Sequence, residues 1–299
     1  MKTFLWLIEA FLFLVPVLFL GILPKNLSIK IGELLGSCLF YTWSSRKEIA
    51  LKNIEIAKKG GLNIPSTPHD IVIRHFKNLG RSFAELSMLF CKRYSIARNV
   101  EFEGIEHYDK AKAKGRGIIF ITGHCGNWEL LAFALAWRGF PLSIVVRPLD
   151  NPYLNRLIER LRMRFGNKVI YKKGAIKKIL MALKKGEDIG ILMDQSVAEN
   201  EAVITEFFGE KVYTTKMPAL LSIKTGSSVI PTFISYTGDG KHRVWFGEEI
   251  TVKDTGNLED DVLYNTEVFS KYIEEYIRQH QSEWLWIHRR WKLSHGRKY

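Results

Sequence analysis

The stretch Gly115–Trp137, GRGIIFITGHCGNWELLAFALAW, decides the fold because it changes from a strand pattern to a helix pattern within a few residues. Its first part, 117–122, is a short β-branched and aromatic run, which predicts a buried strand. Its second part, 128–137, is almost wholly apolar and predicts a helix that stops at Gly139. The turn between them lies at the carboxyl end of a strand, where open α/β sheets usually place their chemistry.

This turn carries two residues suited to acid–base chemistry. Gly123 and Gly126 allow a sharp turn, and Asn127 is the expected N-cap of the helix. His124 then lies in the turn and Glu129 in the first helical turn, where the helix dipole favours an anion. An imidazole accepts a hydroxyl proton near neutral pH, and a nearby carboxylate fixes its tautomer. We therefore predict His124 and Glu129 as the catalytic pair; the alternative is a polar turn residue beside a helix-capping acid.

The rest of the chain alternates strand and helix patterns after this turn. Strand-like runs occupy 142–146, 168–171, 189–193 and 229–235, and helix patterns occupy 152–165, 174–185 and 214–225. This alternation predicts an α/β fold with a mainly parallel sheet flanked by helices. A turn at 237–240 is expected to lead into an antiparallel strand, and a late helix follows at 258–281. Before the sheet, 27–57 and 69–93 have helical patterns; we interpret the aromatic stripe of 69–93 as a packing face.

The N-terminal segment 3–23 is an apolar run interrupted by Glu9 and Pro16. A helix of about 20 residues spans ~30 Å, one hydrocarbon thickness. We predict a membrane anchor helix over 1–25 and a catalytic domain over 26–299, with a signal peptide and a buried soluble helix as alternatives. Lysines and arginines after the helix favour a cytoplasmic catalytic body. The helix could span the membrane or lie within one leaflet; both arrangements stay open, because a charged Glu9 is costly deep in the hydrocarbon layer.

The net charge, the cysteines and the absent motifs narrow the classes of molecule that the protein is expected to bind. The net charge of +13 predicts affinity for anionic phospholipid, phosphorylated glycolipid or an acidic carrier protein. No pattern typical of nucleic-acid binding supports that class. Cys38, Cys91 and Cys125 are odd in number and widely spaced, which argues against a disulfide framework or a zinc site; Cys125, beside His124, is a weaker candidate nucleophile. Because the chain has no serine-hydrolase elbow, Walker loop, dinucleotide fingerprint or zinc-protease motif, we expect no metal and no cofactor.

Three further residues are candidates for substrate binding. Arg147 and Arg164 follow the next strand and helix, and guanidinium groups grip phosphate bidentately or stabilise an oxyanion. Arg162 is the register alternative to Arg164. Asp194 follows the strand 189–193, where it is expected to orient a catalytic arginine or contact a sugar hydroxyl, a strand-end cap being the alternative.

Two other features of the sequence each allow two interpretations. The lysine-rich face over 172–185 is either a solvated surface or a contact for an acidic carrier or headgroup. The tail 284–291, WLWIHRRW, has the composition of an interfacial aromatic and basic cluster, although core packing explains some of its tryptophans.

The motif His124-Cys-Gly-Asn-Trp-Glu129 resembles the His-x-x-x-x-Asp/Glu motif of glycerolipid-type acyltransferases. In its Glu form with Gly-Asn-Trp inside, it is similar to the bacterial lipid A late acyltransferases, the lauroyl and myristoyl transferase family. Further segments resemble that family's signatures in order: Val146-Arg147-Pro148, 162–166, Met193-Asp194-Gln195, 206–209, 214–220 and 284–291. The resemblance covers nearly the whole chain.

The resemblance implies a glycerolipid acyltransferase-like fold and an O-acyltransferase at the cytoplasmic face of a bacterial inner membrane. The enzyme would move a fatty acyl group from acyl carrier protein to a hydroxyl of a lipid A precursor. His124, oriented by Glu129, would take the hydroxyl proton, and Arg164 would hold phosphate or the oxyanion. A lysophospholipid or another glycolipid is the alternative acceptor. A membrane-anchored lipid-binding protein without catalysis is the alternative of another class.

Overall fold

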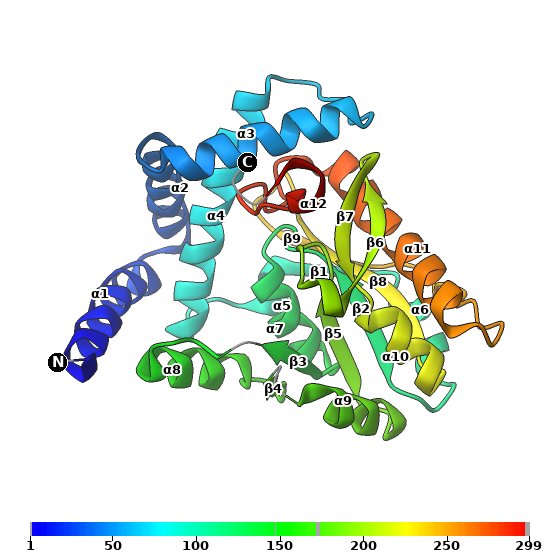
Figure 1. Cartoon of the computed structure of the whole chain (residues 1–299). Coiled ribbons are helices and arrows are strands. Elements are labelled where there is room, and N and C mark those ends of the chain that lie inside the picture. The colour runs from blue at the N-terminus through cyan, green and yellow to red at the C-terminus, as the bar shows by residue number, and fades with distance from the viewer. Residues whose placement is uncertain (1, 147, 172–173, 297–299) are drawn as a thin grey trace.

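The computed structural model describes residues 2–146, 148–171 and 174–296, and a seven-stranded sheet forms its centre (Figure 1). The strand order is β1-β9-β8-β2-β5-β3-β4, and every neighbouring pair is parallel except β8 with β9. The strands are β1 (Val100–Glu103), β2 (Ile118–Thr122), β3 (Leu142–Val146), β4 (Lys168–Tyr171), β5 (Asp188–Leu192), β8 (Ser228–Tyr236) and β9 (His242–Phe246). The predicted α/β fold with a mainly parallel sheet is confirmed.

Helices cover both faces of the sheet, which is why β2 is buried along its whole length. Ile118 and Phe120 point into a core that contains α7, and Ile119 and Ile121 point into the opposite core. The helices around the sheet are α5 (Ile96–Asn99), α6 (Ile105–Lys112), α7 (Trp128–Arg138), α8 (Pro152–Arg162), α9 (Ala175–Lys184), α10 (Met217–Thr225), α11 (Leu258–Gln279) and α12 (Lys292–His295). The lysines of α9 that the structure describes are exposed, as a solvated face requires.

Four long helices precede the short helix α5 and the sheet: α1 (Lys2–Ile22), α2 (Lys25–Thr42), α3 (Ser44–Lys59) and α4 (Pro68–Phe90). Figure 1 shows α4 between the sheet and the arm made by α1 and α2. Glycines let α2 approach the backbone of α4. A Cβ atom on Gly32 would lie 2.4 Å from the carbonyl oxygen of Gly80, and one on Gly36 would lie 2.1 Å from that of Phe76.

The predicted N-terminal helix is present as α1. Among the residues that the structure describes, α1 is the one helix long and apolar enough to cross a membrane. Most of its large apolar side chains are exposed. Its inner face packs on α4 and α8, and Asn151 Nδ2 donates to the Trp6 carbonyl oxygen at 2.8 Å and to Glu9 Oε2 at 3.0 Å. The helix is therefore attached along its length to the α/β body; its separation as a domain over 1–25 stays a prediction.

One hairpin of the structure was not predicted. Strands β6 (Ala202–Phe207) and β7 (Glu210–Thr215) pair antiparallel in a separate two-stranded sheet, so the helix predicted from 214 begins only at Met217. The reversal occurs at Phe208 and Gly209, which have φ values of +50° and +73°. The short elements β1, α5 and α6 were also not predicted.

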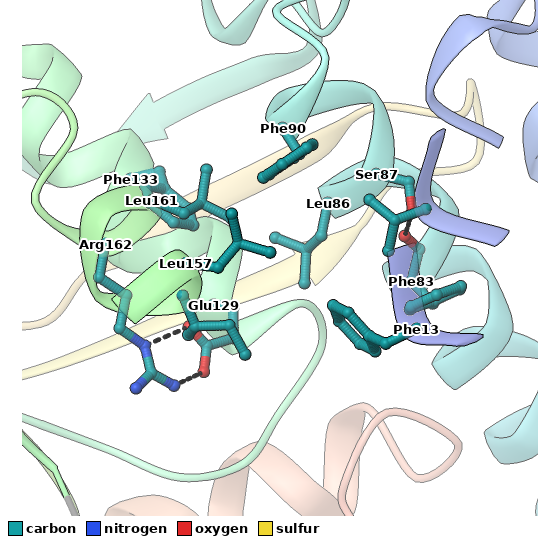
Figure 2. Close-up of a pocket in the computed structure, with 12 residues that line it drawn as sticks. Phe13, Phe83, Leu86, Ser87, Phe90, Glu129, Phe133, Leu157, Leu161 and Arg162 are labelled. Atoms are coloured by element: carbon teal, nitrogen blue, oxygen red, sulfur yellow. Dashed lines mark hydrogen bonds and ion pairs between the residues drawn. The ribbon is translucent and has the colours of Figure 1, made fainter. Parts of the chain in front are cut away.

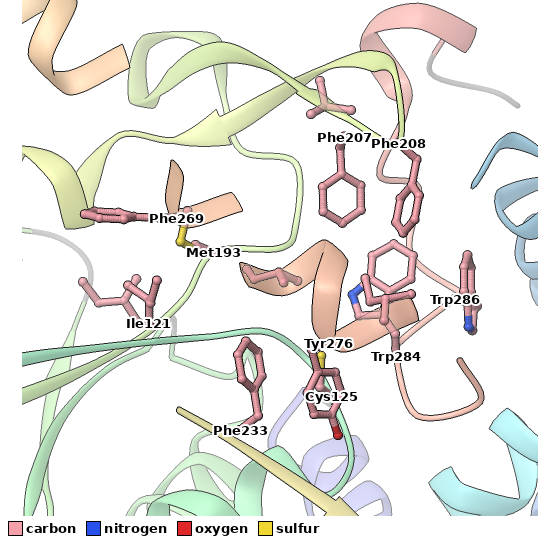
Figure 3. Close-up of a cluster of buried hydrophobic side chains, with 14 of the residues drawn as sticks. Ile121, Cys125, Met193, Phe207, Phe208, Phe233, Phe269, Tyr276, Trp284 and Trp286 are labelled. Atoms are coloured by element: carbon pink, nitrogen blue, oxygen red, sulfur yellow. The ribbon is translucent and has the colours of Figure 1, made fainter. Parts of the chain in front are cut away.

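The hairpin explains an error about the tryptophan-rich tail. Trp284, Trp286 and Trp291 are at most 1% exposed, so the predicted interfacial cluster is wrong and core packing is correct. Figure 3 shows Trp284 near Phe207 and Phe208 of the hairpin. Arg290 is also buried, and it donates to the Tyr213 carbonyl oxygen at 2.7 Å and to Thr214 Oγ1 at 2.6 Å. The tail packs against β6 and β7 and also against α3, whose Asn53 donates to the carbonyl oxygens of Trp286 and His288, so its tryptophans are buried.

Candidate active site

The turn between β2 and α7 is held from both sides. Asn127 Oδ1 accepts the Leu130 amide hydrogen at an N···O distance of 3.2 Å, so the predicted N-cap is confirmed. Gly126 has φ +55°, and a Cβ atom there would lie 2.1 Å from a carbonyl oxygen of β8. The C-terminal segment 283–285 runs beside the turn: the Gly126 amide donates to the Glu283 carbonyl at 2.9 Å, and the Leu285 amide to that of His124 at 3.0 Å.

His124 is bound by Asp194, which follows the neighbouring strand β5. The Nδ1 atom of His124 lies 2.8 Å from Asp194 Oδ1. Asp194 Oδ2 accepts the His124 backbone amide at 3.0 Å and Trp284 Nε1 at 2.8 Å. Because an ionised carboxylate only accepts, the proton belongs on Nδ1 and the lone pair on Nε2. No residue that the structure describes hydrogen-bonds to Nε2, and the His124 side chain is 18% exposed.

The pKa values of this pair favour a charged carboxylate beside a basic imidazole. Burial alone would raise the pKa of Asp194, which is 1% exposed, but the His124 charge and the hydrogen bonds from His124 and Trp284 lower it to about 2. Burial alone would lower the pKa of His124. The charge and hydrogen bond of Asp194, with the charge of Glu129, raise it above its ordinary value. Imidazolium formation is therefore stabilised.

Glu129 faces α8 and is bound by Arg162. Arg162 Nε donates to Oε2 at 3.1 Å and Nη2 to Oε1 at 2.5 Å, a bidentate pair. The two side chains are 30% and 23% exposed, so the pair remains open to a ligand. Among the described residues Glu129 makes no hydrogen bond to His124. The expectation that Glu129 fixes the tautomer of His124 is thus corrected, because Asp194 occupies that position.

The structure separates the two candidate arginines near the end of α8. Arg164 lies beyond the last helical residue; its Nη1 donates to the Leu89 carbonyl oxygen at 2.5 Å, and its guanidinium lies 5.1 Å from the Phe165 ring. It therefore links the end of α8 to the end of α4, whereas Arg162 meets Glu129. Arg147 lies outside the described residues.

Two other predictions from the sequence can be compared with the structure. Asp194 is buried against His124 and Trp284, so an exposed contact with a sugar hydroxyl does not fit its position. Cys125 is buried near Tyr276 (Figure 3), and burial raises the pKa of its thiol well above the ordinary value. This environment disfavours a thiolate nucleophile.

An apolar cavity of about 170 Å³ adjoins the ion pair. Figure 2 shows Arg162 and Glu129 at one side of a group of apolar side chains. The lining residues come from α1, α4, α7 and α8: Phe13, Val17, Phe83, Leu86, Ser87, Phe90, Glu129, Phe133, Leu157, Ile158, Leu161 and Arg162. A second cavity of about 90 Å³, between α7 and the ends of β2, β3 and β5, shares Glu129 and Arg162. Part of the aromatic stripe predicted as a packing face of α4 therefore lines a cavity.

Taken together, the fold and the site define an α/β protein with a carboxylate-bound histidine, an accessible arginine–glutamate pair and an apolar cavity. Such a site suits chemistry on a molecule with a hydrocarbon part. Comparison with known families then identifies the chain: residues 1–293 match the bacterial lipid A biosynthesis acyltransferase family, and the chain belongs to it. The resemblance seen in the sequence is confirmed.

Individual relatives agree with this assignment. The chain is 29% identical over 195 residues to a lipid A biosynthesis acyltransferase of Haemophilus influenzae, a match that spans 64% of this chain and 59% of that relative's length. It is 27% identical over 278 residues to the lipid A biosynthesis lauroyltransferase of Escherichia coli, covering 90% and 87% of the two chains. It is 23% identical over 251 residues to a phosphatidylinositol mannoside acyltransferase of Mycobacterium tuberculosis, covering 81% and 78%.

Proposed function

We propose that this protein is an O-acyltransferase that moves a fatty acyl group from an acyl thioester to a hydroxyl of a lipid A precursor. Acyl carrier protein is the proposed donor. The observation that carries the proposal is His124, whose Nδ1 is fixed by Asp194; Glu129, whose charge acts on His124, lines a cavity suited to a hydrocarbon chain. Membership of the acyltransferase family supports the reaction class.

In the proposed reaction, His124 acts as the general base. Its Nε2 takes the proton of the acceptor hydroxyl while the hydroxyl oxygen attacks the thioester carbonyl carbon. The new C–O bond forms and the C–S bond breaks, and the imidazolium returns its proton to the leaving thiolate. Asp194 stabilises the imidazolium and holds the ring in the tautomer that the first step needs. No covalent enzyme intermediate and no metal take part in this scheme.

Arg162 replaces Arg164 as the proposed partner of substrate charge. Its Nε and one hydrogen of Nη2 bind Glu129, which leaves the other Nη2 hydrogen and both Nη1 hydrogens for a ligand. Those donors suit a phosphate of the acceptor or the oxyanion of the transition state. Glu129 in this proposal holds the guanidinium in place, and its charge also supports the basicity of His124.

The apolar cavity is the proposed place for hydrocarbon of the substrates. It lies between α4 and α8 and ends at Glu129 and Arg162, so a chain inside it would bring its polar end to the charged pair. Replacing Leu157 by Trp would fill part of the cavity and is expected to shift the preferred donor to a shorter acyl chain. Tyr153 on the same helix is exposed, and Tyr153→Trp is the matched control.

We further propose that α1 and α2 attach the protein to the cytoplasmic face of the bacterial inner membrane. The exposed apolar side chains of α1 continue on α2 at Leu27, Leu34, Leu35 and Leu39. The net charge of +13 favours a surface of anionic lipid. Because α1 packs along α4 and α8, its outer face is the part available to lipid.

The experiment is acyl transfer by membranes that carry the wild type, His124→Ala or Arg162→Ala. Each reaction offers acyl carrier protein or coenzyme A thioesters against a lipid A precursor or a lysophospholipid. We expect transfer from acyl carrier protein to the lipid A precursor, lost in both variants and kept in His69→Ala and Arg156→Ala, which change exposed residues. Equal transfer by wild type and His124→Ala would refute the mechanism and favour a lipid-binding protein without catalysis.

A second acceptor class has one specific observation in its favour. The relative from Mycobacterium tuberculosis is named for acylation of phosphatidylinositol mannoside, and it matches 81% of this chain. Acylation of a mannosylated inositol lipid, with the lipid A precursor left unreacted, would keep the mechanism and replace the acceptor.

A further inference from the structure

A buried carboxylate, Glu85 of α4, lies behind the catalytic turn. Its side chain is fully buried and makes three hydrogen bonds to groups from different elements. Arg81 Nε donates at 3.1 Å, His242 Nε2 lies at 2.9 Å, and Asn127 Nδ2 donates at 2.9 Å. Because a buried charge is costly unless it is fully paired, this network holds each partner in one arrangement.

Asn127 is the member of the network that belongs to the turn. Both ends of its amide are used: Nδ2 donates to Glu85 Oε2, and Oδ1 accepts the Leu130 amide that begins α7. An amide can be turned end for end, but a carboxylate accepts hydrogen bonds and does not donate them. Glu85 therefore determines that the oxygen of Asn127, rather than its nitrogen, faces the start of the helix.

The orientation of this amide matters for the chemistry because Asn127 lies between His124 and Glu129 in sequence. The first turn of α7 carries Glu129 and hence its contact with Arg162, and the residues just before it carry His124. A displacement of about 1 Å at such groups costs on the order of 10²-fold in rate. We propose that Glu85 is a positioning residue that fixes the first turn of α7 through Asn127. The kinetic test of this proposal rests on the proposed acyl transfer activity.

The hydrogen-bond polarity supplies a test. In Glu85→Gln the new carbonyl oxygen is expected to face Arg81 and His242, so the new NH₂ group faces Asn127. The Asn127 amide must then reverse, which places its NH₂ against the Leu130 amide and removes the cap. Asn127→Asp keeps an oxygen for Leu130 but sets two carboxylates against each other. The double variant restores the match of hydrogen-bond donors and acceptors. The glutamine amide donates to one oxygen of the new aspartate, and the second oxygen of that aspartate caps the helix.

We expect each single substitution to lower kcat by about tenfold or more with little change in KM, and the double variant to return within about threefold of wild type. Glu55→Gln, on the exposed side of α3, is the control and keeps wild-type kinetics. A double variant no more active than the weaker single variant overturns the proposal. So does a failure of Glu85→Gln to fold that the second substitution does not correct, since Glu85 would then serve overall stability.

A second measurement needs no substrate. Hydrogen exchange of the backbone amides of 128–131, followed by mass spectrometry, is expected to be at least about tenfold faster in both single variants and restored in the double variant. Unchanged exchange in the single variants refutes the positioning role. Wild-type protein that transfers no acyl group but shows the predicted exchange pattern would refute the proposed function and leave the positioning of the turn intact.

Discussion

Asp194→Asn is the substitution that most directly tests how His124 is held. Asp194 Oδ2 accepts two hydrogen bonds, from the His124 amide and Trp284 Nε1, whereas Oδ1 accepts one, from His124 Nδ1. The single carbonyl oxygen of asparagine is expected to replace Oδ2, which directs its NH₂ group at Nδ1. Nδ1 must then accept, so the ring proton moves to Nε2. In that tautomer His124 cannot take a proton from a substrate hydroxyl.

The expected loss is large because two effects act together. Lowering the pKa of Asp194 from 3.8 to about 2 corresponds to about 2 kcal/mol of interaction in favour of the carboxylate, and asparagine removes it. The wrong tautomer is the second effect; in a Ser-His-Asp triad the same substitution, with both effects together, lowers kcat by roughly 10⁴-fold. We expect kcat to fall by about 10³- to 10⁴-fold, or about 4–5.5 kcal/mol in activation free energy, with a small change in KM.

The assay is steady-state acyl transfer across pH. Wild-type activity is expected to fall as the pH drops through the raised pKa of His124, because the imidazolium cannot act as a base. In Asp194→Asn the pKa of His124 falls, so the residual activity declines only at lower pH. Nitrogen-15 NMR of the histidine ring reports the tautomer independently.

Asp188→Asn is the matched control for this experiment. Asp188 is a buried aspartate at the opposite end of β5, where it accepts hydrogen bonds from Tyr108, Lys112 and the Ile118 amide. Its substitution is expected to lower stability and leave kcat within about threefold. A folded Asp194→Asn variant that keeps more than a tenth of the wild-type kcat would refute the assignment of Asp194.

Three other predictions follow from buried groups. While His124 is protonated, the low pKa of Asp194 stabilises the fold by about 2 kcal/mol, and this stabilisation is lost as the pH falls from about 4 to about 2; urea unfolding will show this loss in wild type but not in Asp194→Asn. Cys125→Ala should keep transfer within about threefold, and a maleimide should label exposed Cys38 but leave Cys125 unlabelled in the folded protein. Gly36→Ala places a Cβ atom 2.1 Å from a backbone carbonyl of α4 and should cost about 1–3 kcal/mol by thermal melting, whereas Gly238→Ala, with open space around it, should be neutral.

The elements that the sequence predicted well have strong local patterns. The run 117–122 and the apolar helix after it correspond to β2 and α7, and the cap at Asn127 was found because its side chain acts on the next few residues. The β6–β7 hairpin was missed because its turn depends on positive φ at Phe208, a bulky residue that rarely adopts it. The four-residue strand β1 is too short to show a period.

The site was harder to predict because its main contact joins different strands. Asp194 meets His124 only because β5 lies next to β2, and the sequence does not specify that order. Glu129 was favoured for its closeness in sequence, but its side chain turns to α8. Arg162 is the last residue of α8 and faces Glu129, whereas Arg164 follows the helix and meets the end of α4. The tertiary packing of α8 selects Arg162.

The contacts between the catalytic turn and the segment 283–285 also have a consequence for how the protein is synthesised. The carboxylate of Asp194 is held by Trp284, and the His124 carbonyl is held by Leu285, so the site depends on residues that the ribosome adds late. The apolar α1, in contrast, is made before these residues. Since the ribosome exit tunnel encloses the newest residues, α1 has left the tunnel while His124 and Asp194 still lack their contacts with Leu285 and Trp284. We therefore expect His124 to gain its full set of contacts only after residues 284–285 have been made.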